Sequence, residues 1–226
     1  MLMPYLYLVR HGQPDFTGNY DSITPLGARQ SSWLGAHFTS QELRFARVVS
    51  GTLQRQVDTC DLILREIVGS PAPVRDARFN EYDHASLLAF FEGDRLQDLR
   101  AAGDRRAYFT AIRHALQQWS QHEGAIANGE SWAEFGARIQ AGVAAICDGL
   151  GRDDRALIVS SGGVIGRFVS GVLGAGSDAA IQLNLQTRNT GVTEVVRSKS
   201  GGSRLVSFNS IAHLERPDRQ HAVTFA

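Results

Sequence analysis

The sequence predicts an α/β fold, a three-layer α/β/α sandwich around a mostly parallel sheet. Short apolar runs recur along the chain, and they have the length and residue types of strands buried on both faces. Segments with apolar residues at helical spacing follow these runs, and this alternation is typical of a parallel sheet covered by helices. An additional helical segment, from about 84 to 124, interrupts the pattern within one domain spanning residues 1–226.

The bulk composition is ordinary for a globular protein and argues against some partners. Apolar residues make up 43% of the 226 residues and charged residues 20%. With 23 basic and 23 acidic residues the formal net charge is zero, so we expect neither nucleic acid nor a membrane as a partner. The apolar start at 1–9 lacks the basic region and cleavage site of a signal peptide, which predicts a cytoplasmic protein with reduced Cys60 and Cys147.

The first predicted strand, at 5–9, runs directly into Arg10, His11 and Gly12. Open α/β sheets place their chemistry at the carboxyl ends of strands, which is where these three residues fall. Gly12 lets a ligand approach the backbone closely. His11 can serve as a nucleophile or as an acid/base beside a permanently charged guanidinium.

Two helices follow in the first half of the chain. Thr24-Pro25 is an N-cap followed by proline at the first helical position, which predicts a helix to about Phe38. A second strand at 45–50 leads into a helix that opens at Thr52. Arg55 lies in its first turn, where a cation opposes the helix dipole and costs some stability unless an anion lies nearby.

The middle of the chain carries an acidic pair and then the additional helical segment. Glu81 and Asp83 follow a proline-containing break at 70–73. Within 84–124, four apolar side chains form one helical stripe of the kind that packs into a core: Phe109, Ile112, Leu116 and Trp119.

The second half repeats the alternation of helix and strand. Ser131 and Glu134 form a capping box, which predicts a helix to about Leu150. A buried strand at 156–160 then ends in Ser161-Gly162-Gly163, whose backbone N–H groups at a helix start make a good anion site. Together with two unpaired arginines, Arg10 and Arg55, these strand ends predict a pocket that binds phosphate, sulfate or vanadate.

These motifs resemble those of the histidine phosphatase superfamily, the phosphoglycerate-mutase-like proteins. The similarity lies in Arg10-His11-Gly12, the segment 50–59 around Arg55, Glu81, Gly129-Glu130-Ser131 with Arg138, the strand 156–160 with Gly162-Gly163, and the segments 189–195 and 205–214. It covers 5–83 and 128–214. The intervening stretch is where this superfamily inserts a cap, so the resemblance implies that 84–124 covers the pocket and sets substrate choice.

The resemblance also implies a role for each matching residue. His11 would attack phosphorus and form a phosphohistidine, and Glu81 would be the general acid/base. Arg10 and Arg55 would hold the phosphate with help from Ser161-Gly162. Neither a metal nor a cofactor is required. The expected function is a metal-independent phosphomonoesterase acting on a phosphorylated small molecule or a phosphoprotein.

Ser161 departs from the pattern, because the superfamily carries its second catalytic histidine at this place. A hydroxyl reaches less far and has no positive charge, and losing one such donor can lower a rate by roughly 10²–10³. Glycine amides at 162–163 or another histidine, of which His84 is one candidate, could compensate. Two alternatives therefore stay open: a catalytically weak phosphate-binding or regulatory protein, and a phosphoglycerate-type mutase.

Overall fold

The sheet brings the ends of its central strands side by side. The computed structural model describes residues 4–16, 18–93, 105–127, 129–198 and 202–225. Six strands form one sheet: β1 (Tyr5–Arg10), β2 (Arg47–Ser50), β3 (Val74–Arg75), β4 (Arg155–Ser160), β5 (Val192–Arg197) and β6 (Ser203–Ser210). Their order is β3-β2-β4-β1-β5-β6. The first four are parallel and the last two add antiparallel pairings, which confirms a mostly parallel sheet.

The register aligns three carboxyl ends at one edge. Arg10 at the end of β1 lies opposite Ser160 of β4, and Val159 lies opposite Ser50 at the end of β2. Residues that follow these strands therefore start from neighbouring points. β1 and β4 are buried over almost their whole length, as their continuous apolar runs predict.

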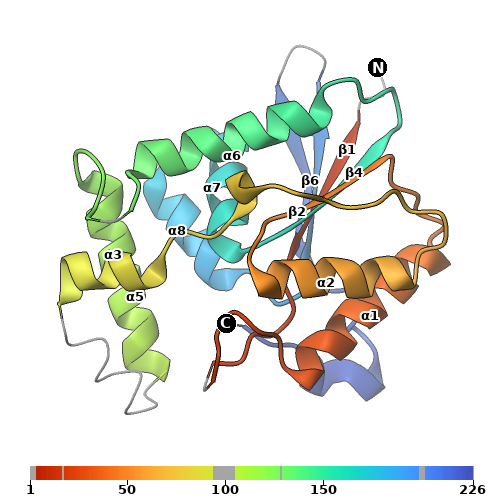
Figure 1. Ribbon diagram of the computed structural model, residues 1–226, viewed down its shortest axis with the longest axis horizontal. Coiled ribbons are helices and arrows are strands. Elements are labelled where there is room, and N and C mark those ends of the chain that lie inside the picture. Colours follow the sequence, from red (N-terminus) through yellow and green to blue (C-terminus); the bar gives the residue numbers. More distant parts are fainter. Residues whose placement is uncertain (1–3, 17, 94–104, 128, 199–201, 226) are drawn as a thin grey trace.

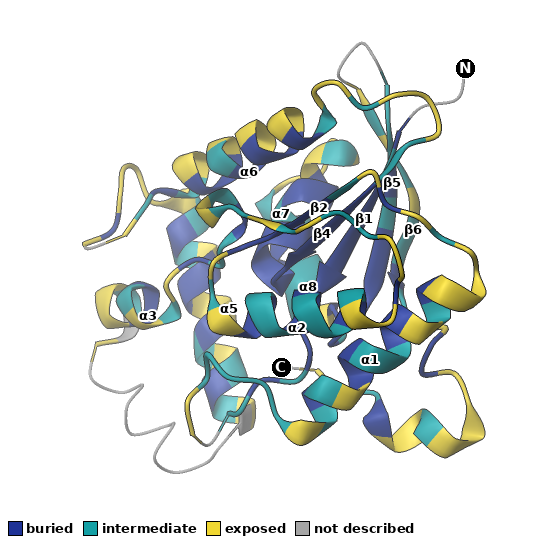
Figure 2. Cartoon of the chain, turned by 45° about the vertical axis from the view of Figure 1, so that its right-hand side comes forward, coloured by how far each residue is buried: buried dark blue, intermediate teal, exposed yellow. Residues whose placement is uncertain are grey.

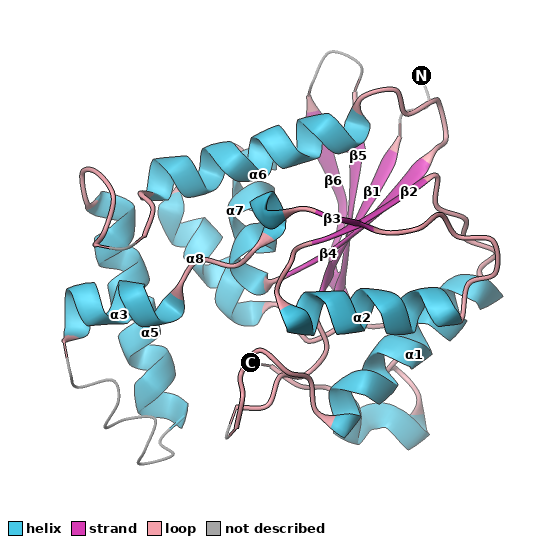
Figure 3. Ribbon diagram, viewed as in Figure 1, coloured by secondary structure: helices cyan, strands magenta, loops and turns pink. Residues whose placement is uncertain are grey.

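Helices cover both faces of the sheet and complete the predicted three layers (Figure 1, Figure 3). They are α1 (Pro25–Ser40), α2 (Gln54–Arg65), α3 (His84–Glu92), α5 (Arg105–Gln121), α6 (Trp132–Cys147), α7 (Gly162–Val172) and α8 (Ser177–Gln186). Tyr7 and Val9 of β1 pack with α1 and α2, whereas Leu6 and Leu8 pack with α6 and α7. Figure 2 shows the buried sides of the helices turned toward the strands.

Local signals fix the helix starts, and the start of α2 and the end of α6 are among the boundaries that differ from prediction. Gly27 donates its amide to the Thr24 hydroxyl at 3.0 Å, and both halves of the capping box before α6 are formed. α2 begins at Gln54 rather than at Thr52, whose amide instead donates to the Asn80 side chain at 2.7 Å. α6 ends at Cys147 rather than near 150, because Gly149 adopts a left-handed φ of 71°.

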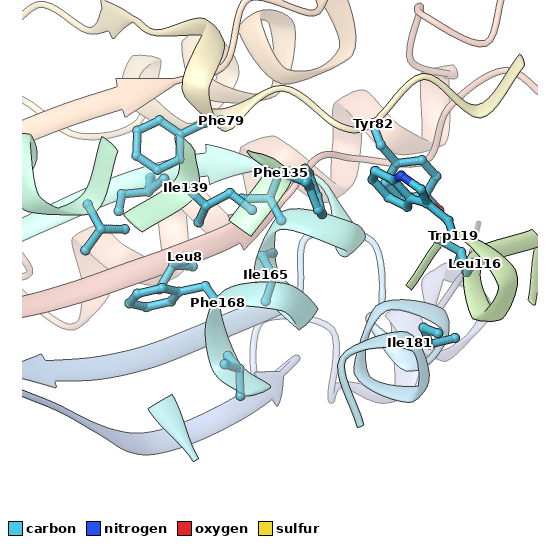
Figure 4. Packing of buried hydrophobic residues seen from close by; sticks show 14 of the residues in the cluster. Leu8, Phe79, Tyr82, Leu116, Trp119, Phe135, Ile139, Ile165, Phe168 and Ile181 are labelled. Atoms are coloured by element: carbon cyan, nitrogen blue, oxygen red, sulfur yellow. The ribbon is translucent and has the colours of Figure 1, made fainter. Parts of the chain in front are cut away.

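The additional segment supplies α3 and α5, which pack together, and α5 also packs against α8 (Figure 1). Ile112, Leu116 and Trp119 are buried, as the stripe predicts, whereas Phe109 is only partly buried. Figure 4 shows Leu116 and Trp119 grouped with Tyr82 at one end of the core. Residues 94–104 of the predicted cap lie outside the described residues. In the described chain, no helix combines the length and apolarity needed to cross a membrane.

Candidate active site

One narrow cavity, with a volume of about 30 Å³, opens at the shared strand edge. Four predicted site residues line it: Arg10, His11, Arg55 and Glu81. The remaining lining residues are mostly apolar or aromatic: Phe16, Tyr20, Tyr82, His84, Tyr108, Phe109, Ile112, Asn184 and Leu185. The structure therefore brings four of the predicted residues together, whereas Ser161 and Gly162 are not among the residues that line the cavity.

His11 is buried and held in one tautomer. Its Nδ1 lies 2.8 Å from the carbonyl oxygen of Gly12. Because a carbonyl only accepts, Nδ1 carries the hydrogen and the lone pair remains on Nε2. Burial, reinforced by the charges of Arg55 and Arg10, holds the pKa of His11 well below its ordinary value. The imidazole is therefore neutral at pH 7, the state in which Nε2 is nucleophilic.

The backbone that carries His11 is anchored by segments far away in the sequence. The Asn189 side chain donates to the His11 carbonyl at 3.1 Å, and the Thr190 amide donates to the Arg10 carbonyl at 3.1 Å. His213 Nε2 lies 2.8 Å from the Thr190 hydroxyl. The motifs near 189 and 213 thus support the end of β1 from behind.

Both arginines are buried and keep donors for an anion. Arg10 is 7% exposed and donates Nη1 to the Thr187 carbonyl. Arg55 is 6% exposed and, contrary to the prediction of two unpaired arginines, forms an ion pair with Asp21 at 2.8 Å. The Nε of each guanidinium is buried and has no hydrogen-bond partner among the described residues. Leaving a buried donor unsatisfied costs about 1–3 kcal/mol, so an oxyanion that reached either Nε would be stabilised by it.

Glu81 is held against the start of α7. Its Oε2 accepts the Gly163 amide at 2.9 Å, and Oε1 accepts the Tyr82 amide at 3.2 Å. A Cβ at position 163 would lie 2.2 Å from Oε1, so glycine is needed for this approach. Burial raises the pKa of Glu81, against the opposing effects of the Gly163 amide, Arg55 and Arg10. The raised pKa favours the protonated carboxyl, which is the form that can donate a proton.

Arg138, a half-buried arginine for which the sequence predicts no role, positions the loop before Glu81. Arg138 on α6 donates Nη1 to the carbonyls of Arg78 and Asn80, each at 2.7 Å. Its other nitrogens form a double hydrogen bond with the Glu130 carboxylate at 2.8 and 2.7 Å. In the sequence, only the family resemblance of Gly129-Glu130-Ser131 and Arg138 points to this residue. That resemblance does not show that Arg138 bonds the loop before Glu81.

Ser161 is 1% exposed, and its side chain does not line the cavity. Its Oγ accepts a hydrogen bond from Gln56 Nε2 at 2.8 Å. Gly162 lies beside Arg10, since a Cβ there would be 3.7 Å from the Arg10 Cζ. The predicted role of Ser161 and Gly162 in phosphate binding stays a prediction.

His84 and the aromatic lining are the site features that the sequence indicated least. His84 begins α3 and stacks on Tyr82 with ring centroids 4.5 Å apart. Tyr108 and Phe109 reach the cavity from α5, so the additional segment does form part of its wall. Within the described ranges, no group of three or more His, Cys, Asp or Glu residues is arranged to hold a metal ion.

The α/β/α fold and the histidine and arginines at the strand ends agree with a known family. The chain matches the histidine phosphatase superfamily (branch 1) over residues 6–211 and belongs to that family. It is 29% identical over 226 residues to "Probable phosphoglycerate mutase GpmB" of Klebsiella pneumoniae (strain 342), covering 95% of this chain and 97% of that one.

Solved structures share the fold at low sequence identity. Bacillus stearothermophilus YhfR superposes with a TM-score of 0.70 at 21% identity, covering 94% of this chain and 100% of that one. The alpha-ribazole phosphatase from Shigella flexneri gives a TM-score of 0.65 at 20% identity, covering 92% and 97%. These likenesses confirm the predicted phosphoglycerate-mutase-like fold.

Proposed function

We propose that the protein is a metal-independent phosphomonoesterase that works through a phosphohistidine on His11. One observation carries this proposal: an imidazole whose Nδ1 faces the Gly12 carbonyl, leaving Nε2 for attack, shares a narrow cavity with two buried guanidiniums and a buried carboxyl. Family membership and the name of the Shigella flexneri structure, an alpha-ribazole phosphatase, add support. The proposed substrate is a phosphorylated small molecule.

The chemistry divides into two displacements. First, Nε2 of His11 attacks phosphorus, the bond from phosphorus to the ester oxygen breaks, and Glu81 gives its proton to that oxygen. Then Glu81 takes a proton from a water that attacks phosphorus, the phosphorus–nitrogen bond breaks, and phosphate leaves. Arg10 and Arg55 balance the charge of the transferring group in both steps.

We further propose that His84 supplies the donor that Ser161 lacks. His84 lines the same cavity as His11, Arg10 and Arg55, which places it beside the groups proposed to bind the phosphoryl group. His84→Gln should lower kcat about 10²-fold, the loss expected for one transition-state donor. An unchanged kcat in this variant would contradict the assignment.

Rapid quenching with a labelled phosphomonoester tests the function itself. Wild-type protein should carry acid-labile phosphate, His11→Asn should carry none, and hydrolysis should persist with a chelator present. Glu81→Gln should accumulate phosphoenzyme if water activation is slowed more than phosphorylation. Phosphate binding without phosphoenzyme or hydrolysis would favour the binding-protein alternative. Movement of the phosphate between positions of a phosphoglycerate, with little release of inorganic phosphate, would favour the mutase alternative.

A further inference from the structure

Six ring side chains form a continuous wall of the cavity, which we call the aromatic belt. In spatial order its members are Tyr82, His84, Tyr20, Phe16, Tyr108 and Phe109. The centroids of successive rings lie 4.5, 6.0, 6.5, 5.3 and 5.8 Å apart. The belt joins the loop after β1, the segment that enters α3, and α5. It is therefore built by packing the additional helices against the first loop.

The charged side chains of the cavity adjoin this belt, and the Arg55 guanidinium lies over the Tyr20 ring, 5.0 Å from its centroid. Under the proposed function, the groups that serve the phosphoryl group and the ester oxygen are Arg10, Arg55, His11, Glu81 and His84. Among the lining residues that the structure describes, the guanidiniums are Arg10 and Arg55, and Arg55 is already paired with Asp21. Phe16, Tyr108 and Phe109 carry no cationic group, so a carboxylate or second phosphate that lay against these rings would be desolvated without a partner, which is costly.

We infer that the site selects phosphomonoesters whose leaving group is an uncharged, planar ring, and that it discriminates against leaving groups that carry a carboxylate or a second phosphate. This inference rests on the proposed function, because it concerns the part of the substrate beyond the phosphoryl group. The narrow cavity holds the phosphoryl group, and the belt receives the ring.

Phe109 is the belt member best placed to set this preference. It lies on α5, is only partly buried, and therefore offers ring surface to a substrate, whereas Tyr108 is 3% exposed and belongs to the core. Contacts between aromatic rings strengthen binding by about two- to twelvefold beyond the effect of buried area. Apolar area adds to this, so we expect at least a ~10-fold preference for a ring over a short alkyl group.

The experiment compares three esters: benzyl phosphate, ethyl phosphate and 3-phosphoglycerate. All three release alkoxide-type leaving groups, so differences in kcat/KM report contacts rather than leaving-group chemistry. Wild type should favour benzyl over ethyl phosphate about tenfold or more and should use 3-phosphoglycerate least. Phe109→Ala should collapse the benzyl-to-ethyl ratio toward one. Phe90→Ala is the matched control, because Phe90 is an exposed phenylalanine on α3 outside the cavity lining, and it should keep the wild-type ratio.

Competition binding of benzylphosphonate and ethylphosphonate separates this inference from the proposed function. Equal hydrolysis of benzyl and ethyl phosphate, a preference for 3-phosphoglycerate, or an unchanged ratio in Phe109→Ala would overturn the inference while leaving the phosphatase proposal intact. Absence of hydrolysis with every ester would overturn the phosphatase proposal. In that case tighter binding of benzylphosphonate, lost in Phe109→Ala, would still support the ligand class, and equal binding would overturn it.

Discussion

At the scale of single residues, burial in the cavity shifts the pKa values of His11 and Glu81 in opposite directions, and each direction suits a different role. Burial and two neighbouring cations keep His11 neutral, whereas burial keeps a proton on Glu81 to higher pH than usual. A nucleophile and an acid can then coexist at one pH. The Gly163 amide orients the carboxyl and opposes this shift only in part.

If Glu81 is the general acid, the effect of Glu81→Gln should depend on whether the leaving group needs a proton. We expect kcat/KM to fall about 10²- to 10⁴-fold for ethyl phosphate and far less for 4-nitrophenyl phosphate, because nitrophenolate departs without a proton. The acid acts when protonated, so wild-type kcat/KM for ethyl phosphate should decline as pH rises through the raised pKa, and the variant should lose this decline. pH–rate profiles with both esters measure this. Asp83→Asn serves as control, and equal losses with the two esters would rule out the acid role.

Ser161→His tests whether the missing histidine limits turnover, but Gln56 stands in the way. The serine is 1% exposed and hydrogen-bonded to Gln56, so a larger ring should overpack the site and lower the free energy of unfolding by about 1–3 kcal/mol. Adding Gln56→Ala should recover stability and raise kcat above that of Gln56→Ala alone. Urea unfolding and steady-state kinetics check both points. A double variant no faster than its Gln56→Ala parent would show that the donor is not limiting.

At the scale of elements, α6 supports the loop that ends in Glu81 through hydrogen bonds from Arg138. Arg138 spans from Glu130 to two carbonyls of that loop, Ser160 adds a hydrogen bond to the Phe79 carbonyl at 2.6 Å, and Asn80 bonds Thr52. Small displacements of an acid from its substrate can cost large factors in rate. The loop is therefore positioned by helices and strands on both sides of it.

Arg138→Gln should act through Glu81. We expect kcat/KM for ethyl phosphate to fall about tenfold or more, because the freed loop no longer fixes the carboxyl. In a Glu81→Gln background the same change should have little further effect, a coupling that general loss of stability would not produce. Arg65→Gln, which removes an exposed arginine from the end of α2, is the control. Additive losses in the double variant would contradict a positioning role.

The elements that could be predicted are those whose local sequence already contains the decisive interaction. β1 and β4 are apolar throughout because both faces are covered, and the α6 capping box closes within four residues. β3 has only two residues, and α8 buries only Ala180 and Ile181. Neither segment therefore shows a hydrophobic periodicity from which its secondary structure could be predicted.

In the site, the strand-end position of Arg10 and His11 could be predicted in the same way, because it follows from one strand and the sheet. The Gln56–Ser161 contact joins positions 105 apart, and the Gly163–Glu81 bond joins positions 82 apart. Asp21 likewise reaches Arg55 from a polar loop. Such pairs depend on how elements pack, and a single sequence has no local signal for them.

At the scale of the whole molecule, the segment after β6 ties the end of the chain to the site. Ile211 and Leu214 pack with Leu26 and Trp33 of α1, and His213 between them bonds Thr190, whose backbone has a left-handed φ of 55°. An unfavourable backbone at Thr190 is thus held by a buried histidine. Protonation of that histidine therefore bears on the stability of the entire fold.

The free energy of unfolding should fall as pH drops below about 6.5, the ordinary pKa of histidine in the unfolded chain. Burial lowers the pKa of His213 to about 3 and that of His11 well below its ordinary value. Between these limits the unfolded chain binds protons that the folded chain does not, so each histidine contributes a slope of up to about 1.4 kcal/mol per pH unit. Urea unfolding from pH 8 to pH 4 measures this slope. His213→Asn keeps a polar partner for Thr190 and should lower the slope by up to about 1.4 kcal/mol per pH unit, the contribution of one histidine. His221→Asn, an exposed histidine, provides the comparison. A slope identical in wild type and His213→Asn would show that His213 titrates alike in the folded and unfolded states.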